Sequence, residues 1–224
     1  MNSEIKAIFF DVGNTLLFPN RERIHAPLEE RGIRPDDKLL RDLERRIKNE
    51  FDRLMINDGS HDHSFWFMFY SQFVKDIGLH DDELRDQLVT GVRDSSNWDQ
   101  ILPGTREQLQ KIGSSYRIGV ISNADGRIED VLRRCGIADC FESITDSGRI
   151  GYEKPHPEIF RRATESLRAK PQESLYVGDV YSVDYLGATG AGMQALLMDI
   201  AGAYADKGVE RVESLEELQA LLAT

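Results

Sequence analysis

Five short segments of this chain are apolar along most of their length, and they restrict its fold more than any other feature. They are IKAIFF (5–10), YRIGVIS (116–122), FESIT (141–145), SLYVGD (174–179) and QALLMD (194–199). A strand with continuous rather than alternating apolar residues has both faces buried, as happens when helices cover both sides of a parallel sheet. The five segments therefore predict an α/β fold built on a parallel sheet.

Helical patterns lie between the later strands and at the end of the chain, at 127–135, 157–168, 184–190 and 214–222. Gly136 stands where a helix commonly ends in a left-handed residue, and Ser214 with Glu217 forms a capping box. This alternation of strand and helix predicts a Rossmann-like, doubly wound sheet.

The first strand is separated from the second by about a hundred residues that contain no further strand of this type. Amphipathic helices are predicted there at 21–32, 36–57, 62–77 and 81–94, and the run FWFMFY offers aromatic bulk for a small core. We therefore expect a helical domain over residues 17–98, inserted into an α/β core made of residues 1–16 and 99–224.

The composition limits the partners of the chain. With 28 basic and 39 acidic side chains the net charge is −11, which argues against nucleic acid or an anionic membrane as a partner. The two cysteines are expected to be reduced thiols. The start MNSEIKAIFFDVG does not resemble a signal peptide, and no stretch approaches the roughly 20 apolar residues of a membrane helix. We expect a soluble, cytoplasmic monomer or homodimer.

Polar side chains follow four of the predicted strands. Asp11-Val-Gly-Asn-Thr15 follows the first and Ser122-Asn123 the second, Lys154-Pro155 lies after the third, and Asp179 with Asp184 follows the fourth. Carboxyl ends of parallel strands meet at one edge of an open sheet, where ligands bind. The sequence therefore predicts a site of carboxylates, one ammonium group, hydroxyls and an amide at this edge.

These segments resemble the haloacid dehalogenase-like hydrolase superfamily over nearly the whole chain. The matching motifs are FFDVGNTL (9–16), VISNA (120–124), GYEKPHPEIF (151–160) and YVGDVYSVD (176–184), in the family's order. The resemblance implies that the helical insert is a type 1 cap, and that Asp11 is a nucleophile that forms an aspartyl-phosphate. It also implies Mg²⁺ as the cofactor, with Asp11, the main-chain carbonyl of Gly13 and Asp179 as ligands and Asp184 close by.

The remaining roles that the resemblance implies concern the phosphate. Lys154 would neutralise the nucleophile and the phosphate, Ser122 and the N–H of Asn123 would bind phosphate oxygens, and Thr15 would hydrogen-bond the loop or the nucleophile. Each residue also has a structural alternative. Asp11 and Asp184 are typical helix caps, Ser122 and Asn123 typical turn residues, and a lysine before a proline is commonly exposed.

One position departs from the family's phosphatases. They carry a second Asp two residues after the nucleophile as general acid and base, a contribution worth about 10²–10⁴ in rate, and here that residue is Gly13. Asn14 and His25 are candidate replacements. A substrate with a good leaving group, such as an acyl or aryl phosphate, needs less acid catalysis.

Three hypotheses follow. The leading one is a Mg²⁺-dependent phosphatase acting on a small phosphorylated metabolite. The second is carbon–halogen or carbon–phosphorus hydrolysis; the latter would need a Schiff-base lysine from the insert, for which Lys38, Lys48 and Lys75 are candidates. The third is a catalytically impaired binding protein, because Gly13 replaces the acid/base.

Overall fold

A computed structural model of the chain describes residues 5–58 and 65–223. Its main sheet has six strands in the order β5-β4-β1-β6-β7-β8, and all of its pairs are parallel. The strands are β1 (Ala7–Phe10), β4 (Arg117–Ser122), β5 (Ser143–Asp146), β6 (Ser174–Gly178), β7 (Gln194–Met198) and β8 (Arg211–Val212). The five strands predicted from apolar runs are confirmed, each with ends within two residues of the prediction. β8 was not predicted, since two residues are too short for a recognisable pattern.

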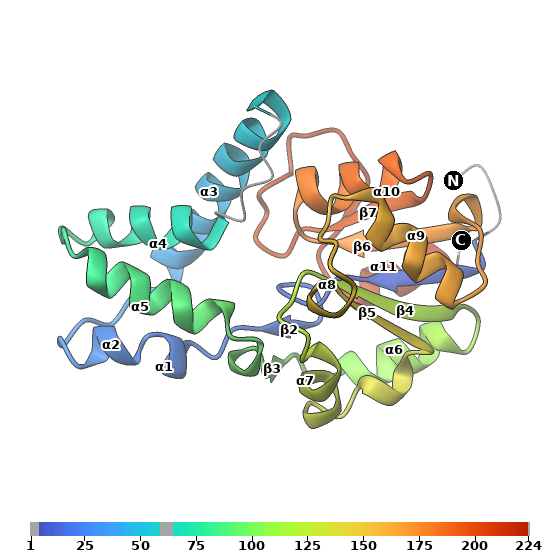
Figure 1. Ribbon diagram of the computed structural model, residues 1–224, viewed down its shortest axis with the longest axis horizontal. Helices are drawn as coiled ribbons and strands as arrows, with labels where there is room; N and C mark the ends of the chain where they lie inside the picture. Colours follow the sequence, from blue (N-terminus) through green and yellow to red (C-terminus); the bar gives the residue numbers. More distant parts are fainter. Residues whose placement is uncertain (1–4, 59–64, 224) are drawn as a thin grey trace.

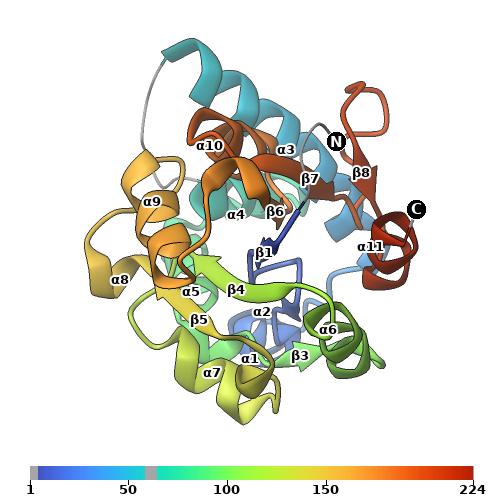
Figure 2. The same ribbon diagram turned by 90° about the vertical axis from the view of Figure 1, so that its right-hand side faces the viewer.

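Helices cover both faces of this sheet (Figures 1 and 2). One face packs against α6 (Thr105–Gly113), α7 (Ile128–Arg134) and α11 (Leu215–Leu222), and the other against α9 (Pro157–Ser166) and α10 (Leu186–Gly190). In β1, Ile8 and Phe10 belong to the first of these cores and Ala7 and Phe9 to the second, and all four are fully buried. This explains why β1 is apolar at every position, and it confirms the predicted doubly wound α/β fold.

Two caps predicted from sequence are also present. Gly136 adopts a φ of +73° after α7, the left-handed conformation that a residue without a Cβ adopts readily. Ser214 Oγ accepts a hydrogen bond from the N–H of Glu217 at 3.1 Å and so caps α11. Other short elements are α8 (Ser147–Ile150) and the single turns η1 (Ser95–Asn97), η2 (Ala138–Cys140), η3 (Pro171–Glu173) and η4 (Tyr181–Tyr185).

The helices that follow β1 form a separate group to one side of the sheet (Figure 1). They are α1 (Arg21–Ile24), α2 (Ala26–Glu29), α3 (Asp37–Asp58), α4 (Phe65–Asp76) and α5 (Asp82–Arg93). A two-stranded antiparallel pair, β2 (Leu17–Phe18) with β3 (Gln100–Ile101), lies where the chain enters and leaves this group, called here the helical insert.

The prediction of one helix over 21–32 was wrong. The chain forms two short helices that meet at His25, and Pro27 stands in the first turn of the second. Proline has no N–H to continue the hydrogen-bond ladder of a preceding helix, but it fits the first turn of a new one. The start of the helix predicted at 62–77 lies outside the described residues. None of the described helices combines the length and the apolar character that crossing a membrane requires.

Candidate active site

The sheet brings the predicted polar residues together at the carboxyl ends of its central strands. Asp11 directly follows β1, Ser122 ends β4 and Asp179 directly follows β6, and β1 lies between β4 and β6. From β1 the chain builds the sheet outward through β4 and β5 and then crosses back to β6 on the other side of β1. The strand order therefore reverses beside β1, and an open sheet binds ligands at such a point. The site is buried: its carboxylates, lysine and serine are each at most 7% exposed, namely Asp11, Ser122, Lys154, Asp179 and Asp184.

Lys154 is the centre of the hydrogen-bond network. Its Nζ lies 2.6 Å from Asp11 Oδ1 and 2.8 Å from Asp184 Oδ1, and it also donates to the hydroxyl of Tyr176 at 2.7 Å. The Tyr176 hydroxyl in turn donates to Asp184 Oδ1 at 3.1 Å. Lys154 is therefore not an exposed lysine before a proline. Burial alone would lower its pKa, but the carboxylates of Asp11 and Asp184 outweigh burial and hold the pKa above its usual range.

The loop that carries Lys154 is fixed by the side chain of Asn123. Its Oδ1 accepts a hydrogen bond from the Lys154 N–H at 2.7 Å, and its Nδ2 donates to the Lys154 carbonyl at 3.0 Å. This pairing is a positioning role that the sequence did not indicate. Asp184 is held similarly, because its Oδ2 accepts from the N–H of Val180 at 2.9 Å and its carboxyl group packs on Gly178, where any Cβ would collide with it.

The three carboxylates of the site could hold a metal ion together. Asp11, Asp179 and Asp184 each offer an oxygen within 4.8 Å of the others. Burial, reinforced by the two other carboxylates, outweighs the nearby Lys154 and raises the pKa of Asp11 to about 7. Burial likewise raises the pKa of Asp179.

The charge balance of the cluster fits a divalent cation. Four carboxylates surround two ammonium groups, an excess of two negative charges when all are ionised: Asp11, Glu44, Asp179 and Asp184 against Lys48 and Lys154. Uncompensated buried charge is strongly unfavourable, and an all-oxygen donor set is the kind that Mg²⁺ prefers.

Lys48 reaches the site from the helical insert. It lies on α3, is 1% exposed, and its Nζ contacts Asp179 Oδ2 at 2.8 Å and Glu44 Oε1 at 3.0 Å. Burial alone would lower the pKa of Lys48, but Asp179 and Glu44 outweigh it and hold the pKa well above its usual range. Lys48 is therefore an ammonium ion beside one of the candidate metal ligands.

Three neighbours of Lys48 on α3 make further polar contacts with the core. Arg45 donates to the carbonyl of Ala201, Asn49 Nδ2 donates to the carbonyl of Ala203 at 3.2 Å, and Asp52 Oδ1 accepts from the N–H of Ser182 at 2.8 Å. Positions 45, 48, 49 and 52 lie on one face of a helix. We call these four residues the docking stripe of α3.

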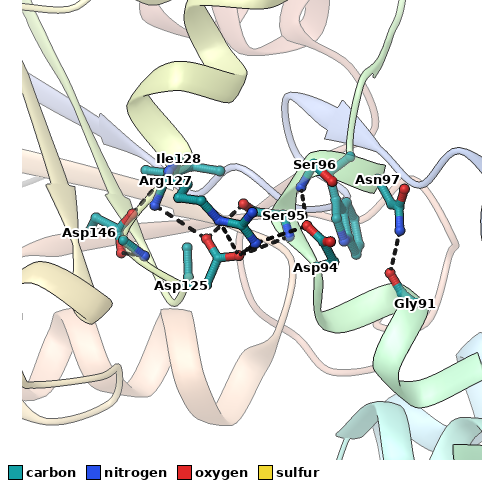
Figure 3. Close-up of polar contacts among 12 residues, drawn as sticks. Gly91, Asp94, Ser95, Ser96, Asn97, Asp125, Arg127, Ile128 and Asp146 are labelled. Atoms are coloured by element: carbon teal, nitrogen blue, oxygen red, sulfur yellow. Dashed lines mark hydrogen bonds and ion pairs between the residues drawn. The ribbon is translucent and has the colours of Figure 1, made fainter. Parts of the chain in front are cut away.

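A second polar contact joins the insert to the core near the loop after β4 (Figure 3). Ser95 Oγ donates to Asp125 Oδ1 at 2.7 Å, and Arg127 bridges Asp125 and Asp94 with Nη2 3.0 Å from Asp94 Oδ1. Asp94 and Ser95 directly follow α5, so this cluster fixes the end of the insert to the loop that begins with Ser122 and Asn123.

A cavity of about 740 Å³ lies between the site and the insert. Its polar part includes Asp11, Gly13, Ser122, Asn123, Lys154, Asp179 and Asp184. Its apolar part comes mainly from the insert and the segment that follows it, and includes Phe51, Met55, Phe65, Trp66, Val92 and Trp98.

Two residues considered from sequence do not take the expected place. Thr15 does not line the cavity, and its buried Oγ1 makes no hydrogen bond within residues 5–58 and 65–223, so the expected bond to the loop or the nucleophile is not formed. His25 is buried inside the insert, with Nε2 3.2 Å from the Tyr70 hydroxyl and its ring stacked on Phe73. It is not a proton donor to this cavity, whereas Asn14 does line it.

Sequence reasoning missed several residues of the site. In the sequence, Tyr176 is indistinguishable from the other core residues of an apolar strand. Trp66 and Trp98 are likewise typical of residues in the core of the insert. Lys48 was one of three lysines considered, with no local signal to prefer it. Only the folded arrangement of α3 against the core selects it.

A parallel sheet with a buried aspartate and lysine at its carboxyl edge, next to an inserted group of helices, is typical of a doubly wound α/β enzyme. The chain belongs to the haloacid dehalogenase-like hydrolase family, whose sequence model matches residues 5–192.

Relatives support this assignment. The chain is 29% identical to haloacid dehalogenase-like hydrolase domain-containing protein 3 of Xenopus laevis, over 87% of this chain and 84% of that one. It is 30% identical to a glyceraldehyde 3-phosphate phosphatase of Methanopyrus kandleri, over 84% of this chain and 82% of that one. The fold is shared with the magnesium-bound HAD-hydrolase YfnB of Bacillus subtilis, at a TM-score of 0.71 and 19% identity over 99% of this chain and all of that one.

Proposed function

We propose that this hydrolase is a Mg²⁺-dependent phosphatase that hydrolyses a small phosphorylated metabolite through an aspartyl-phosphate. The observation that carries the proposal is the contact of Asp11 with Lys154 at 2.6 Å, with two further carboxylates close by. A relative named as a phosphatase, aligned over most of both chains, supports the reaction class.

In this proposal Asp11 attacks phosphorus, which divides one difficult hydrolysis into two easier steps. Lys154 holds the Asp11 carboxylate in place and offsets negative charge on the phosphoryl oxygens, as an ammonium group does at developing charge. Ser122 and the N–H of Asn123 bind phosphate oxygens, while the Asn123 side chain keeps Lys154 in position.

Asp11, Asp179 and the main-chain carbonyl of Gly13 would hold Mg²⁺, with Asp184 beside them. The ion, when bound, supplies positive charge that stabilises the transferred phosphoryl group. YfnB, which shares the fold, was crystallised with magnesium.

We further propose that residues 17–98 form a cap domain and that residues 1–16 and 99–224 form the core. The cavity lies between the two, so the cap faces the leaving group of a substrate whose phosphate contacts the core. Closure of such a domain excludes water and selects the substrate.

The contacts of Lys48 argue against Lys48 as the Schiff-base lysine of the carbon–phosphorus alternative. A Schiff base needs a neutral amine, whereas Lys48 is held as an ammonium ion by Asp179 and Glu44. Its place in the site is therefore that of a cation rather than of a nucleophile.

The proposal is tested by phosphate release from sugar, acyl, nucleotide and aryl phosphates, with Mg²⁺ and with a chelator. Asp11→Asn protein, purified identically, is the matched blank, because the substitution keeps the shape of the side chain and removes the nucleophile. Metal-dependent release that Asp11→Asn abolishes supports the proposal. Full turnover by Asp11→Asn contradicts the assignment of the nucleophile. If the wild type releases no phosphate from any compound of the panel, the proposed phosphatase activity is contradicted. Release of halide from haloacids would then indicate dehalogenation.

A further inference from the structure

The space beside Gly13 is occupied by an aromatic ring. A Cβ at Gly13 would lie 3.3 Å from Cζ3 and 3.5 Å from Cη2 of Trp98. Trp98 is 8% exposed, and its indole N–H donates to the carbonyl of Val92 at 2.7 Å. Because the ring is buried and held by this bond, a larger residue at position 13 would crowd it and would need the ring to shift by a few tenths of an ångström. The position two residues after the nucleophile therefore carries no proton donor and has little room for one.

Trp98 also belongs to an aromatic wall of the cavity. Trp66 meets it edge to face at a centroid distance of 5.5 Å, Phe65 meets Trp66 at 5.0 Å and Phe51 meets Phe65 at 5.7 Å. All four residues line the same cavity as the polar cluster at the strand ends. We call them the aromatic wall. A phosphate bound at the polar cluster would direct its leaving group at this wall.

The two observations point to the same substrate chemistry. An aliphatic alkoxide is about as strong a base as hydroxide, so it leaves poorly unless an acid protonates it. A phenol has a pKa of about 10, and a phenolate departs without that help. Flat apolar rings also pack well against tryptophan and phenylalanine, whereas the hydroxyls of a sugar would lose their hydrogen bonds there.

We propose that this site hydrolyses phosphate monoesters whose leaving group is a flat, apolar and weakly basic oxyanion, such as an aryl or conjugated enol phosphate. The proposal rests on the phosphatase function above and specifies its substrate class. A bond forms between an Asp11 carboxylate oxygen and phosphorus, and the phosphorus–oxygen bond to the ring breaks, its electron pair leaving on the oxyanion. Water then attacks the aspartyl-phosphate and restores the Asp11 carboxylate, with both protons of the water remaining on the released dihydrogen phosphate.

The first test measures kcat/KM of the wild type, with Mg²⁺, for substituted phenyl phosphates of graded leaving-group pKa and for glycerol, propyl and sugar phosphates. We expect a steep fall of kcat/KM with increasing leaving-group pKa, and aryl phosphates favoured over alkyl phosphates by about 10²–10⁴, the usual contribution of a general acid. A flat dependence, or a preference for alkyl phosphates, overturns the proposal and leaves the phosphatase function standing. Absence of phosphate release from every compound overturns both.

A second test separates binding from chemistry and uses matched variants on one helix. Phenylphosphonate and propylphosphonate, which are not hydrolysed, are titrated into wild type, Trp66→Ala and Phe67→Ala. Phe67 neighbours Trp66 in sequence but is 41% exposed and lies outside this cavity, with the Arg85 guanidinium 4.7 Å from its ring centre. We expect phenylphosphonate to bind roughly tenfold tighter than propylphosphonate, and Trp66→Ala alone to remove most of the difference. Equal binding of the two phosphonates by the wild type, or an equal effect of the two variants, overturns the role of the wall.

Discussion

Replacing Lys48 by Met tests whether a lysine from the insert and a metal ion compete for the same carboxylate. Methionine keeps the length and apolar stem of the side chain and removes the charge. In the structure that charge lies 2.8 Å from Asp179 and 3.0 Å from Glu44, with only 1% of the lysine exposed. The variant therefore leaves two carboxylates without their shared cation.

The expected cost to the metal-free protein is large. Removing one partner of a buried ion pair destabilises a protein by about 3–5 kcal/mol, because the other charge stays buried and unpaired. At about 2–4 °C per kcal/mol for a chain of this size, the melting temperature should fall by roughly 6–20 °C.

The same substitution should strengthen metal binding. A divalent and a monovalent cation about 4 Å apart repel by about 8 kcal/mol at an effective dielectric constant of 20. We expect the flexible lysine side chain to shift when the ion binds and so to relieve most of this repulsion. If only one fifth remains, the affinity for Mg²⁺ rises about tenfold when the lysine is removed, since about 1.4 kcal/mol is a factor of ten.

Isothermal titration of Mg²⁺ into chelator-treated wild type and Lys48→Met measures the affinity, and thermal unfolding with and without Mg²⁺ measures the stability. Lys38→Met, on the same helix but at an exposed position, is the control and should change neither. Mg²⁺ should raise the melting temperature of Lys48→Met more than that of wild type, by mass action on the folded state. Unchanged or weaker Mg²⁺ binding by Lys48→Met would refute the competition.

Three further outcomes are expected. The Mg²⁺ affinity of the wild type should weaken by up to about tenfold per pH unit below pH about 7. Burial raises the pKa of Asp11 to about 7, so below that pH a proton competes with the ion for this carboxylate. Titrations of Mg²⁺ at pH 5.5 and 8 measure this effect, and equal affinities would contradict it. Burial, with the charge of Arg21 adding to it, lowers the pKa of His25 to about 4. As the pH falls, the unfolded chain therefore protonates His25 before the folded protein does. The stability that His25 contributes above pH 6.5 is lost as the pH falls toward 4. The loss is at most roughly 3 kcal/mol, and urea unfolding at pH 7 and 4.5 should show a smaller difference in His25→Gln than in wild type. Ser95→Ala should lower the free energy of unfolding, measured in urea, by about 1 kcal/mol. Asp125 loses the hydrogen bond that the Ser95 hydroxyl donates to it at 2.7 Å. A change near zero would show that water replaces this hydrogen bond fully.

The sequence was sufficient to predict five of the six strands of the sheet and the edge where the site lies. Strands buried on both faces leave continuous apolar runs, and parallel strands bring their carboxyl ends together. Asp11, Ser122 and Asp179 could therefore be placed at one edge from the sequence alone. Lys154 was harder to place, because its loop is fixed by the side chain of Asn123, a contact across 31 residues that no local pattern reports.

The contacts between insert and core could not be predicted, for a reason visible in α3. A helix face that docks reversibly on another domain is polar, and Arg45, Lys48, Asn49 and Asp52 have the composition of a solvated face. Their partners are largely main-chain groups of Ala201, Ala203 and Ser182, which every residue possesses. Neither side of this contact leaves a sequence signal.

If residues 17–98 act as the proposed cap, the polar character of the docking stripe would let the site both close and reopen. Apolar surfaces that pack in the closed state would be exposed to water on opening, at a cost proportional to their area, whereas main-chain carbonyls and charged side chains exchange their partners for water at small net cost. The aromatic wall lies on the cavity side of the insert and the docking stripe at its contact with the core. Under the proposed function, the aromatic wall would select the leaving group and the docking stripe would permit movement, and Lys48 would link that movement to the metal site through its contact with Asp179.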